Sequence, residues 1–273
     1  MMMIALFLAA VLEKGVAGYA ALDLDSGRRI EVHGGDRFPM GSVFKLPTAI
    51  ALLRRVDRGE FHLDQSVTIT PDEFVGGWSP IRENAHGKPV TMTLGELLRF
   101  MLGESDNTAA DKVLAMIGGP EVVTKTIRDF GIDDIRVDRS ERILGRDSAD
   151  KMAYANDPRD TSTPNAMIAL LSKIYFREEG LSPQSHALMF NIMASTPRGK
   201  TKLPAAVPPG SVVAHKTGLM PGVSNDVGIV TTPDGKHHFA IAVFVKASPL
   251  KDEEKDAQVR EIAHNLYEQL AQR

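Results

Sequence analysis

The chain of 273 residues contains no cysteine. It therefore has no disulfide bond, and it offers neither a thiolate nucleophile nor a zinc–thiolate site. Its eight histidines do not suggest a metal site either. The adjacent His237 and His238 fall in a predicted strand, where neighbouring side chains point to opposite faces of a sheet. The sequence implies no metal ion and no organic cofactor.

An excess of positive charge and a long apolar run are also lacking. The formal net charge is -3 and the pI is about 6.3, whereas proteins that bind nucleic acids need clustered Lys and Arg to neutralise phosphates. The apolar start, residues 1–12, is too short to span a bilayer and lacks the positive flank of a signal peptide. We interpret it as the first helix of the fold, with a clipped signal peptide as the alternative. Neither nucleic acids nor membranes are expected partners.

Strand patterns occupy both ends of the chain. Residues 16–24 and 28–33 alternate as strands around a turn at Asp25, Ser26 and Gly27, which predicts a hairpin. Three more strands are predicted near the C-terminus, at residues 211–217, 226–231 and 238–245. A last helix follows, with apolar residues on one stripe at positions 259, 262, 263, 266 and 270.

The middle of the chain is helical in pattern. Apolar residues recur at helical spacing over residues 43–56, 94–101, 109–116, 122–130 and 167–176. Strands at both ends of a helical middle predict an α/β (α+β) fold with two domains. Residues 1–38 and 203–273 would form an antiparallel sheet flanked by the N- and C-terminal helices, and residues 39–202 an all-helical domain. An active site would lie in the crevice between them, and the polar stretch 139–164, which lacks apolar periodicity, is predicted to be a functional loop.

Ser42 and Lys45 lie one turn apart at the start of the first predicted middle helix. A serine hydroxyl becomes a good nucleophile when a neighbouring base takes its proton, and a partly desolvated lysine can do so. A helix N-terminus also offers backbone N–H groups to a developing oxyanion. Taken alone, the pattern favours a capping serine and a solvated lysine, because Ser-x-x-Lys arises by chance about once in a chain of this size.

Two further triplets, Ser-Asp-Asn from Ser105 and Lys-Thr-Gly from Lys216, follow in the chain order that this chemistry requires. Ser105 could pass a proton to a leaving nitrogen, and Asn107 could hold a substrate amide carbonyl. Lys216 and Thr217 could bind a substrate carboxylate. The structural alternatives are a helix cap for Ser105 and a strand-end surface charge for Lys216. Three elements in the right order and context make the catalytic interpretation the better one.

With these motifs the sequence resembles the class A serine β-lactamases over nearly the whole chain. The D,D-peptidases that recognise penicillin share the same three elements. Arg139, Glu141 and Leu144 match the class A loop that follows the helical block. The resemblance implies a β-lactamase/transpeptidase-like fold and a small β-lactam substrate. It also implies that Glu141 is the general base for the water that releases the acyl-enzyme.

The resemblance implies further contacts in the same region. Residues 159–164 resemble the end of the class A loop, which implies an ion pair between Arg139 and Asp160. Trp78 begins a segment similar to the aromatic-Ser-Pro segment at the cleft rim, where it would stack on substrate, although a packed surface tryptophan is the alternative. The oxyanion hole would consist of the backbone N–H groups of Ser42 and Leu219.

The sequence departs from the family pattern at several positions. Gly145 stands where most class A enzymes carry an asparagine that helps to hold the hydrolytic water, and residues 146–158 form a longer loop than usual. Asn225 replaces an arginine that supports carboxylate recognition in many members, while Lys202 matches a position where other members carry that cation. Lys202 is therefore predicted to join Lys216 and Thr217 at the carboxylate. His215 before the lysine looks closest to the extended-spectrum branch, although the substrate spectrum is not read from it.

The predicted function is that of a serine β-lactamase, which confers resistance by opening the β-lactam amide through an acyl-enzyme on Ser42. Either Lys45 or Glu141, acting through a water, could be the base for acylation. The alternatives are a D,D-peptidase or slow-deacylating penicillin-binding protein, and a non-catalytic sensor module. From the family we expect a monomer that is periplasmic or secreted.

Overall fold

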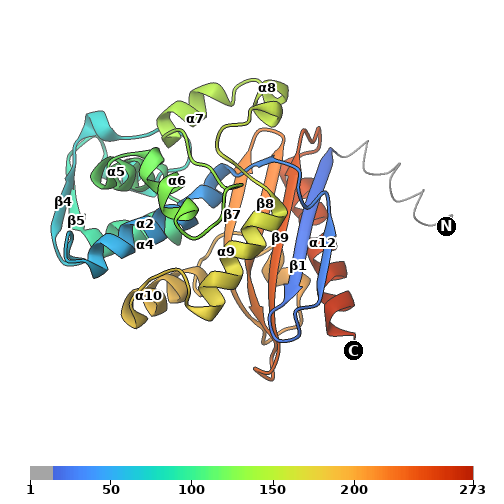
Figure 1. Ribbon diagram of the computed structural model, residues 1–273. Coiled ribbons are helices and arrows are strands. Elements are labelled where there is room, and N and C mark those ends of the chain that lie inside the picture. The colour runs from blue at the N-terminus through green and yellow to red at the C-terminus, as the bar shows by residue number, and fades with distance from the viewer. Residues whose placement is uncertain (1–14, 273) are drawn as a thin grey trace.

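The protein is described by a computed structural model that covers residues 15–272. The helix expected at residues 1–12 lies outside the described residues. A five-stranded antiparallel sheet in the order β2-β1-β9-β8-β7 joins both ends of the described chain (Figure 1). Its strands are β1 (Val16–Asp23), β2 (Arg29–Val32), β7 (Val212–Met220), β8 (Val223–Thr231) and β9 (His238–Lys246). The predicted strands and their antiparallel arrangement are confirmed, except that β9 begins at His238 and leaves His237 before the strand.

The β1–β2 hairpin has a local cause in its turn. The carboxylate of Asp23 accepts hydrogen bonds from the backbone N–H of Asp25 at 3.0 Å and from the hydroxyl of Ser26 at 2.6 Å. Gly27 then adopts a φ of +78°, which a residue without a Cβ adopts at little cost. The turn therefore closes where the sequence predicts it.

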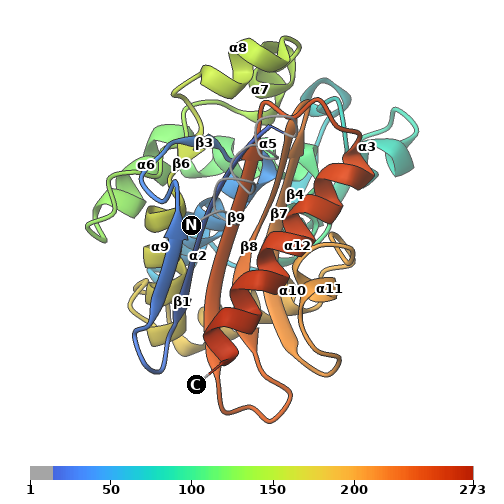
Figure 2. The same cartoon turned by 90° about the vertical axis from the view of Figure 1, so that its right-hand side faces the viewer.

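Helices cover both faces of the sheet. Helix α12 (Asp252–Ala271) lies across one face, and α9 (Pro164–Phe176) packs on the other against β1 and β9 (Figures 1 and 2). All nine residues of β8 except the last are buried. Coverage on both sides explains why β9 reads as a nearly continuous apolar run rather than as an alternating strand.

The helical part is built around α2 (Lys45–Asp57), whose first nine residues are buried. It begins with a short 3₁₀ turn, η1 (Gly41–Phe44), and one apolar core continues from α2 to the face of the sheet that α9 covers. The other helices are α3 (Pro80–Ala85), α4 (Leu94–Leu102), α5 (Asn107–Ile117), α6 (Pro120–Arg128), α10 (Pro183–Ala194) and α11 (Leu203–Ala206). The remaining short elements are η2 (Pro71–Glu73), β3 (Phe38–Pro39) paired with β6 (Thr161–Ser162), and β4 (Ser66–Ile69) paired with β5 (Val90–Thr93).

The stretch 139–164, which is predicted to be a functional loop, contains regular secondary structure. It contains two short helices, α7 (Glu141–Asp147) and α8 (Lys151–Asn156), and the strand β6. Helix α8 starts at a side-chain cap, because Asp150 accepts hydrogen bonds from the N–H groups of Met152 and Ala153. Helices this short bury few residues, so they leave no apolar period to detect.

The two predicted domains share their core. Helix α9 belongs to the predicted all-helical range 39–202, yet it contacts β1, β8 and β9. We propose that the division at residues 38 and 203 holds in sequence, with α9 as a layer common to both parts. Within residues 15–272 no helix has the length and apolarity needed to cross a membrane.

Candidate active site

A cleft of about 770 Å³ runs between the helical part and strand β7. Seven of the predicted site residues line it: Ser42, Trp78, Ser105, Asn107, Glu141, Thr217 and Leu219. Lys45 and Lys216 are buried next to these residues and reach them with their ammonium groups. The fold thus brings segments that are up to about 180 residues apart in the chain together at one cleft.

Ser42 lies in η1, directly before α2, and its hydroxyl faces two ionisable groups. The Nζ atom of Lys45 is 2.9 Å from Ser42 Oγ, and Glu141 Oε1 is 3.4 Å from the same atom. Lys45 and Glu141 also form an ion pair at 2.7 Å, with 0% and 3% of their side chains exposed. A hydroxyl in contact with a buried carboxylate and a buried amine has two routes by which to lose its proton.

Lys45 holds several chain segments together at this point. Besides Ser42 and Glu141, its ammonium donates to the carbonyl of Ser105 and to Oδ1 of Asn107, each at 2.8 Å. Ser105 has a φ of +62°, a strained conformation for a residue with a side chain. The hydrogen bond from Lys45 to its carbonyl helps to keep it in that conformation, which directs its hydroxyl to Lys216.

Lys216 comes from β7 and donates to Ser105 Oγ and to the carbonyl of Thr217, both at 2.9 Å. Burial, together with the nearby charge of Lys45, lowers the pKa of Lys216 well below its usual value. A lysine that gives up a proton readily, hydrogen-bonded to a hydroxyl in a cleft, is suited to proton relay.

Gly218 allows β7 to approach the turn that carries Ser42. A Cβ atom at this position would lie 2.2 Å from the carbonyl oxygen of Met40, which no side chain can tolerate. The close approach brings the backbone nitrogen of Leu219 beside η1, within 3.4 Å of where a Cβ on Gly41 would lie. The next backbone N–H after the Lys-Thr-Gly triplet is therefore beside the turn that carries Ser42.

Glu141 is positioned by a residue that the sequence analysis missed. Asp111 on α5 accepts hydrogen bonds from the backbone N–H of Glu141 at 2.5 Å and of Arg142 at 3.1 Å. Burial raises the pKa of Asp111, while these hydrogen bonds oppose the rise. Asp111 follows Asn107 by one helical turn, so both lie on one face of α5. This spacing of four residues from Asn107 is the feature of the sequence from which Asp111 could have been predicted.

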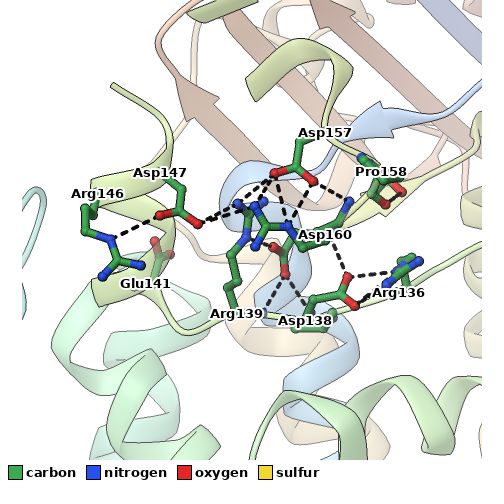
Figure 3. Close-up of polar contacts among 12 residues, drawn as sticks. Arg136, Asp138, Arg139, Glu141, Arg146, Asp147, Asp157, Pro158 and Asp160 are labelled. Atoms are coloured by element: carbon green, nitrogen blue, oxygen red, sulfur yellow. Dashed lines mark hydrogen bonds and ion pairs between the residues drawn. The ribbon is translucent and has the colours of Figure 1, made fainter. Parts of the chain in front are cut away.

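The loop that carries Glu141 is closed by a cluster of ion pairs (Figure 3). Arg139, only 3% exposed, contacts Asp160 at 2.5 Å, Asp157 at 3.0 Å and Asp147 at 3.1 Å. The predicted ion pair between Arg139 and Asp160 is confirmed. The two further carboxylates join the ends of α7 and α8 to the same guanidinium, which fixes the loop near Glu141.

The pKa of Asp157, one carboxylate of this cluster, allows a prediction of how the stability of the protein changes in acid. Hydrogen bonds from Arg159 hold the pKa of Asp157 at about 2. The stabilisation from Asp157 is therefore complete above the pKa of an unfolded aspartate, about 4, and is lost as the pH falls through about 2. We expect Asp157→Asn to lower the free energy of unfolding at pH 6, and the difference from wild type to shrink towards pH 3.

The measurement is urea unfolding of both proteins between pH 3 and pH 6. Asp129→Asn is the matched control, because Asp129 forms an exposed ion pair with Lys125 and such pairs contribute little. A difference between Asp157→Asn and wild type that stays constant over this range would contradict the prediction.

Lys202 is the predicted site residue that does not reach the cleft. Its side chain is 3% exposed, and its ammonium pairs with Asp256 of α12 at 3.1 Å. It also donates to the backbone carbonyl of Asn225 at 3.4 Å. Because its charge is already compensated on the far side of the strands, the predicted direct contact with a substrate carboxylate has no support in this geometry.

Trp78 lies at the rim with 42% of its surface exposed. Its Nε1 donates to the carbonyl of Glu104 at 2.8 Å, and the guanidinium of Arg198 sits 4.1 Å from its ring centroid. Arg198 also lines the cleft, as do Arg142, Arg146 and Lys151, and the sequence analysis singled out none of these cations. In residues 15–272 no group of three or more His, Asp or Glu side chains is arranged to hold a metal ion.

Comparison with known proteins agrees with this geometry. The β-lactamase enzyme family model matches residues 5–270. The β-lactamase VEB-1 of Pseudomonas aeruginosa is 31% identical over 90% of this chain and 82% of its own length. The extended-spectrum β-lactamase PER-1 of the same organism is 31% identical over 94% of this chain and 83% of its own length.

Solved structures give the same result. A β-lactamase from Chitinophaga pinensis is 34% identical with a TM-score of 0.86, and 98% of each chain is covered. A mutant of the last common ancestor of Gram-negative bacteria β-lactamase class A is 33% identical with a TM-score of 0.88, over 98% of this chain and 99% of that one. The family match over nearly the whole chain and the shared fold place this protein in the β-lactamase enzyme family, among its class A members.

Proposed function

We propose that this β-lactamase acts through an acyl-enzyme on Ser42, and that a water activated by Glu141 releases the product. The observation that carries the proposal is the set of contacts among Ser42 Oγ, Lys45 Nζ and Glu141 Oε1, which span 2.7 to 3.4 Å at the cleft. These distances are within, or slightly longer than, those needed for proton transfer, as is common for catalytic hydrogen bonds in an enzyme without substrate.

Acylation begins with attack of Ser42 Oγ on the lactam carbonyl. Either Lys45 first gives a proton to Glu141, 2.7 Å away, and then as a neutral amine takes the serine proton at 2.9 Å, or Glu141 takes the serine proton itself at 3.4 Å, directly or through a water. The carbonyl oxygen takes up negative charge, and the backbone N–H groups of Ser42 and Leu219 are the proposed donors to it. Ser105 then protonates the leaving nitrogen and recovers a proton from Lys216, which is hydrogen-bonded to it.

Deacylation requires a base on the side of the ester where water can enter. Glu141 lines the cleft beside Ser42, and the contacts with Asp111 hold its backbone in place. A D,D-peptidase or a non-catalytic penicillin sensor does not require such a carboxylate, so Glu141 favours the hydrolase. The test is steady-state turnover of nitrocefin by the purified protein. Many turnovers per enzyme are expected, whereas trapping of one equivalent would support the peptidase alternative.

Gly145 offers a way to test how the hydrolytic water is held. It lies on α7 and lines the cleft, and a Cβ added there would meet no atom within 4 Å. We expect Gly145→Asn to fit and to speed deacylation about fivefold, because an amide adds one hydrogen bond worth about 1 kcal/mol to the water. The measurement is the decay of the acyl-enzyme by mass spectrometry after excess benzylpenicillin is removed. Gly145→Ala is the control, and equal rates for the two variants would rule out a role for the amide.

We further propose that the protein is a monomer that is periplasmic or secreted and that it confers resistance to β-lactams. Membership of the β-lactamase enzyme family supports this proposal. Light scattering of the purified protein tests the oligomeric state.

A further inference from the structure

The positions predicted to recognise a substrate carboxylate supply only part of the positive charge that this task needs. Lys216 is 2% exposed, and its pKa is lowered by burial. Lys202 is paired with Asp256. Asn225 is uncharged, and its amide nitrogen already donates to two backbone carbonyls before Ser42, each at 2.9 Å. The other basic residues that line the cleft are therefore the candidates for the remaining charge.

Four basic residues line the cleft, and two of them are already engaged. Arg142 donates to two backbone carbonyls at 2.7 and 3.2 Å, and Arg146 pairs with Asp147 at 3.1 Å. Arg198 and Lys151 have no acidic partner within ion-pair distance in the part of the chain that the structure describes. These two are the candidates for a ligand's negative charge.

Position distinguishes Arg198 from Lys151. Arg198 directly precedes Gly199, where an added Cβ would lie 2.3 Å from Cγ2 of Thr217. The loop that carries Arg198 is thus packed against the residue that follows Lys216. Lys151, in contrast, lies beside the β7–β8 turn, with its Cβ 3.7 Å from where a side chain on Gly222 would begin.

Trp78 holds the Arg198 side chain in a useful orientation. The guanidinium stacks 4.1 Å from the ring centroid, and the ring is itself anchored by the hydrogen bond from Nε1 to Glu104. A guanidinium that stacks through its face keeps the N–H donors along its edge available. An edge with parallel donors matches a carboxylate in a bidentate arrangement.

We propose that Arg198, held over Trp78, is a specificity-determining residue that binds the carboxylate of the β-lactam substrate next to Thr217. The inference rests on the proposed function and adds to it the residue that selects anionic substrates. In this arrangement Trp78 positions the Arg198 side chain across the cleft, in addition to any stacking on substrate.

The experiment compares benzylpenicillin with its methyl ester, which keeps the lactam ring and removes the negative charge. Arg198→Ala is expected to lower kcat/KM for the free acid about tenfold or more, mainly through KM, as loss of a charge-assisted contact does. The ester should change less than about twofold. Arg198→Lys should recover part of the loss, because it restores the charge without the planar edge.

The control is Lys200→Ala, which removes an exposed positive charge from the same loop and does not touch the cleft lining. It should leave both substrates unaffected. The double variant Trp78→Ala with Arg198→Ala should show a smaller loss of kcat/KM for the free acid than the two single losses combined, because both substitutions disturb the same contact. Equal losses on acid and ester, or none on the acid, would overturn the inference alone. If the wild type opens neither compound, the proposed function fails as well.

Discussion

Substitution of Ser42 by alanine is expected to reduce hydrolysis of β-lactams to the background rate and to abolish the covalent adduct. Ser42 Oγ is the hydroxyl that contacts both Lys45 and Glu141, at 2.9 and 3.4 Å. Removal of the nucleophile in a serine hydrolase costs on the order of 10⁶-fold in kcat. Mass spectrometry with a slowly hydrolysed β-lactam provides the measurement, because the wild type should gain the mass of the opened drug and the variant should not.

Two controls make this result specific. Circular dichroism should show that Ser42→Ala is folded, as expected for the loss of one half-buried hydroxyl. Ser195→Ala removes an exposed hydroxyl at the end of α10 whose donor bond goes to the carbonyl of Asn191, and it should keep full activity. An adduct that persists on the Ser42 variant would show that another residue is the nucleophile.

Substitution of Glu141 by glutamine is expected to trap the enzyme after acylation. Glutamine keeps the size of the side chain and an oxygen for Lys45, and the backbone N–H still donates to Asp111. It cannot accept a proton from water, so deacylation should slow by about 10²–10⁴-fold. Gly145 should make the loss larger, because it has no side-chain amide that could help to hold the water in place of Glu141.

The measurement follows enzyme mixed with excess benzylpenicillin over time after the substrate is removed. The Glu141 variant should accumulate the adduct and lose it slowly. Its acylation rate also identifies the first proton acceptor, because rapid acylation points to Lys45 and slow acylation to Glu141. If the variant turns over as fast as wild type with no adduct, Glu141 is not the deacylation base, and the peptidase-like alternative must be reconsidered.

The sequence alone determined the candidate catalytic motifs and the order of the main elements. Ser42 and Lys45 are one turn apart, and such local spacing follows from helix geometry wherever the helix lies. Apolar periodicity, which is also a local property, predicts the strands at both ends and five of the helices between them, α2, α4, α5, α6 and α9. Helices α3, α10 and α11 lie outside the predicted ranges. The short helices α7 and α8 were missed, since their stability depends on side-chain caps and on the Arg139 cluster rather than on an apolar face.

The partners of the charged residues were decided only by the tertiary structure. Lys202 pairs with Asp256, Arg198 stacks on Trp78, and Asp111 holds Glu141. Each pair joins residues that are at least 30 positions apart, and a charge of one sign has many possible partners in the sequence. The pairing therefore depends on how β7, α12 and the loops pack against one another, which no local pattern of residues specifies.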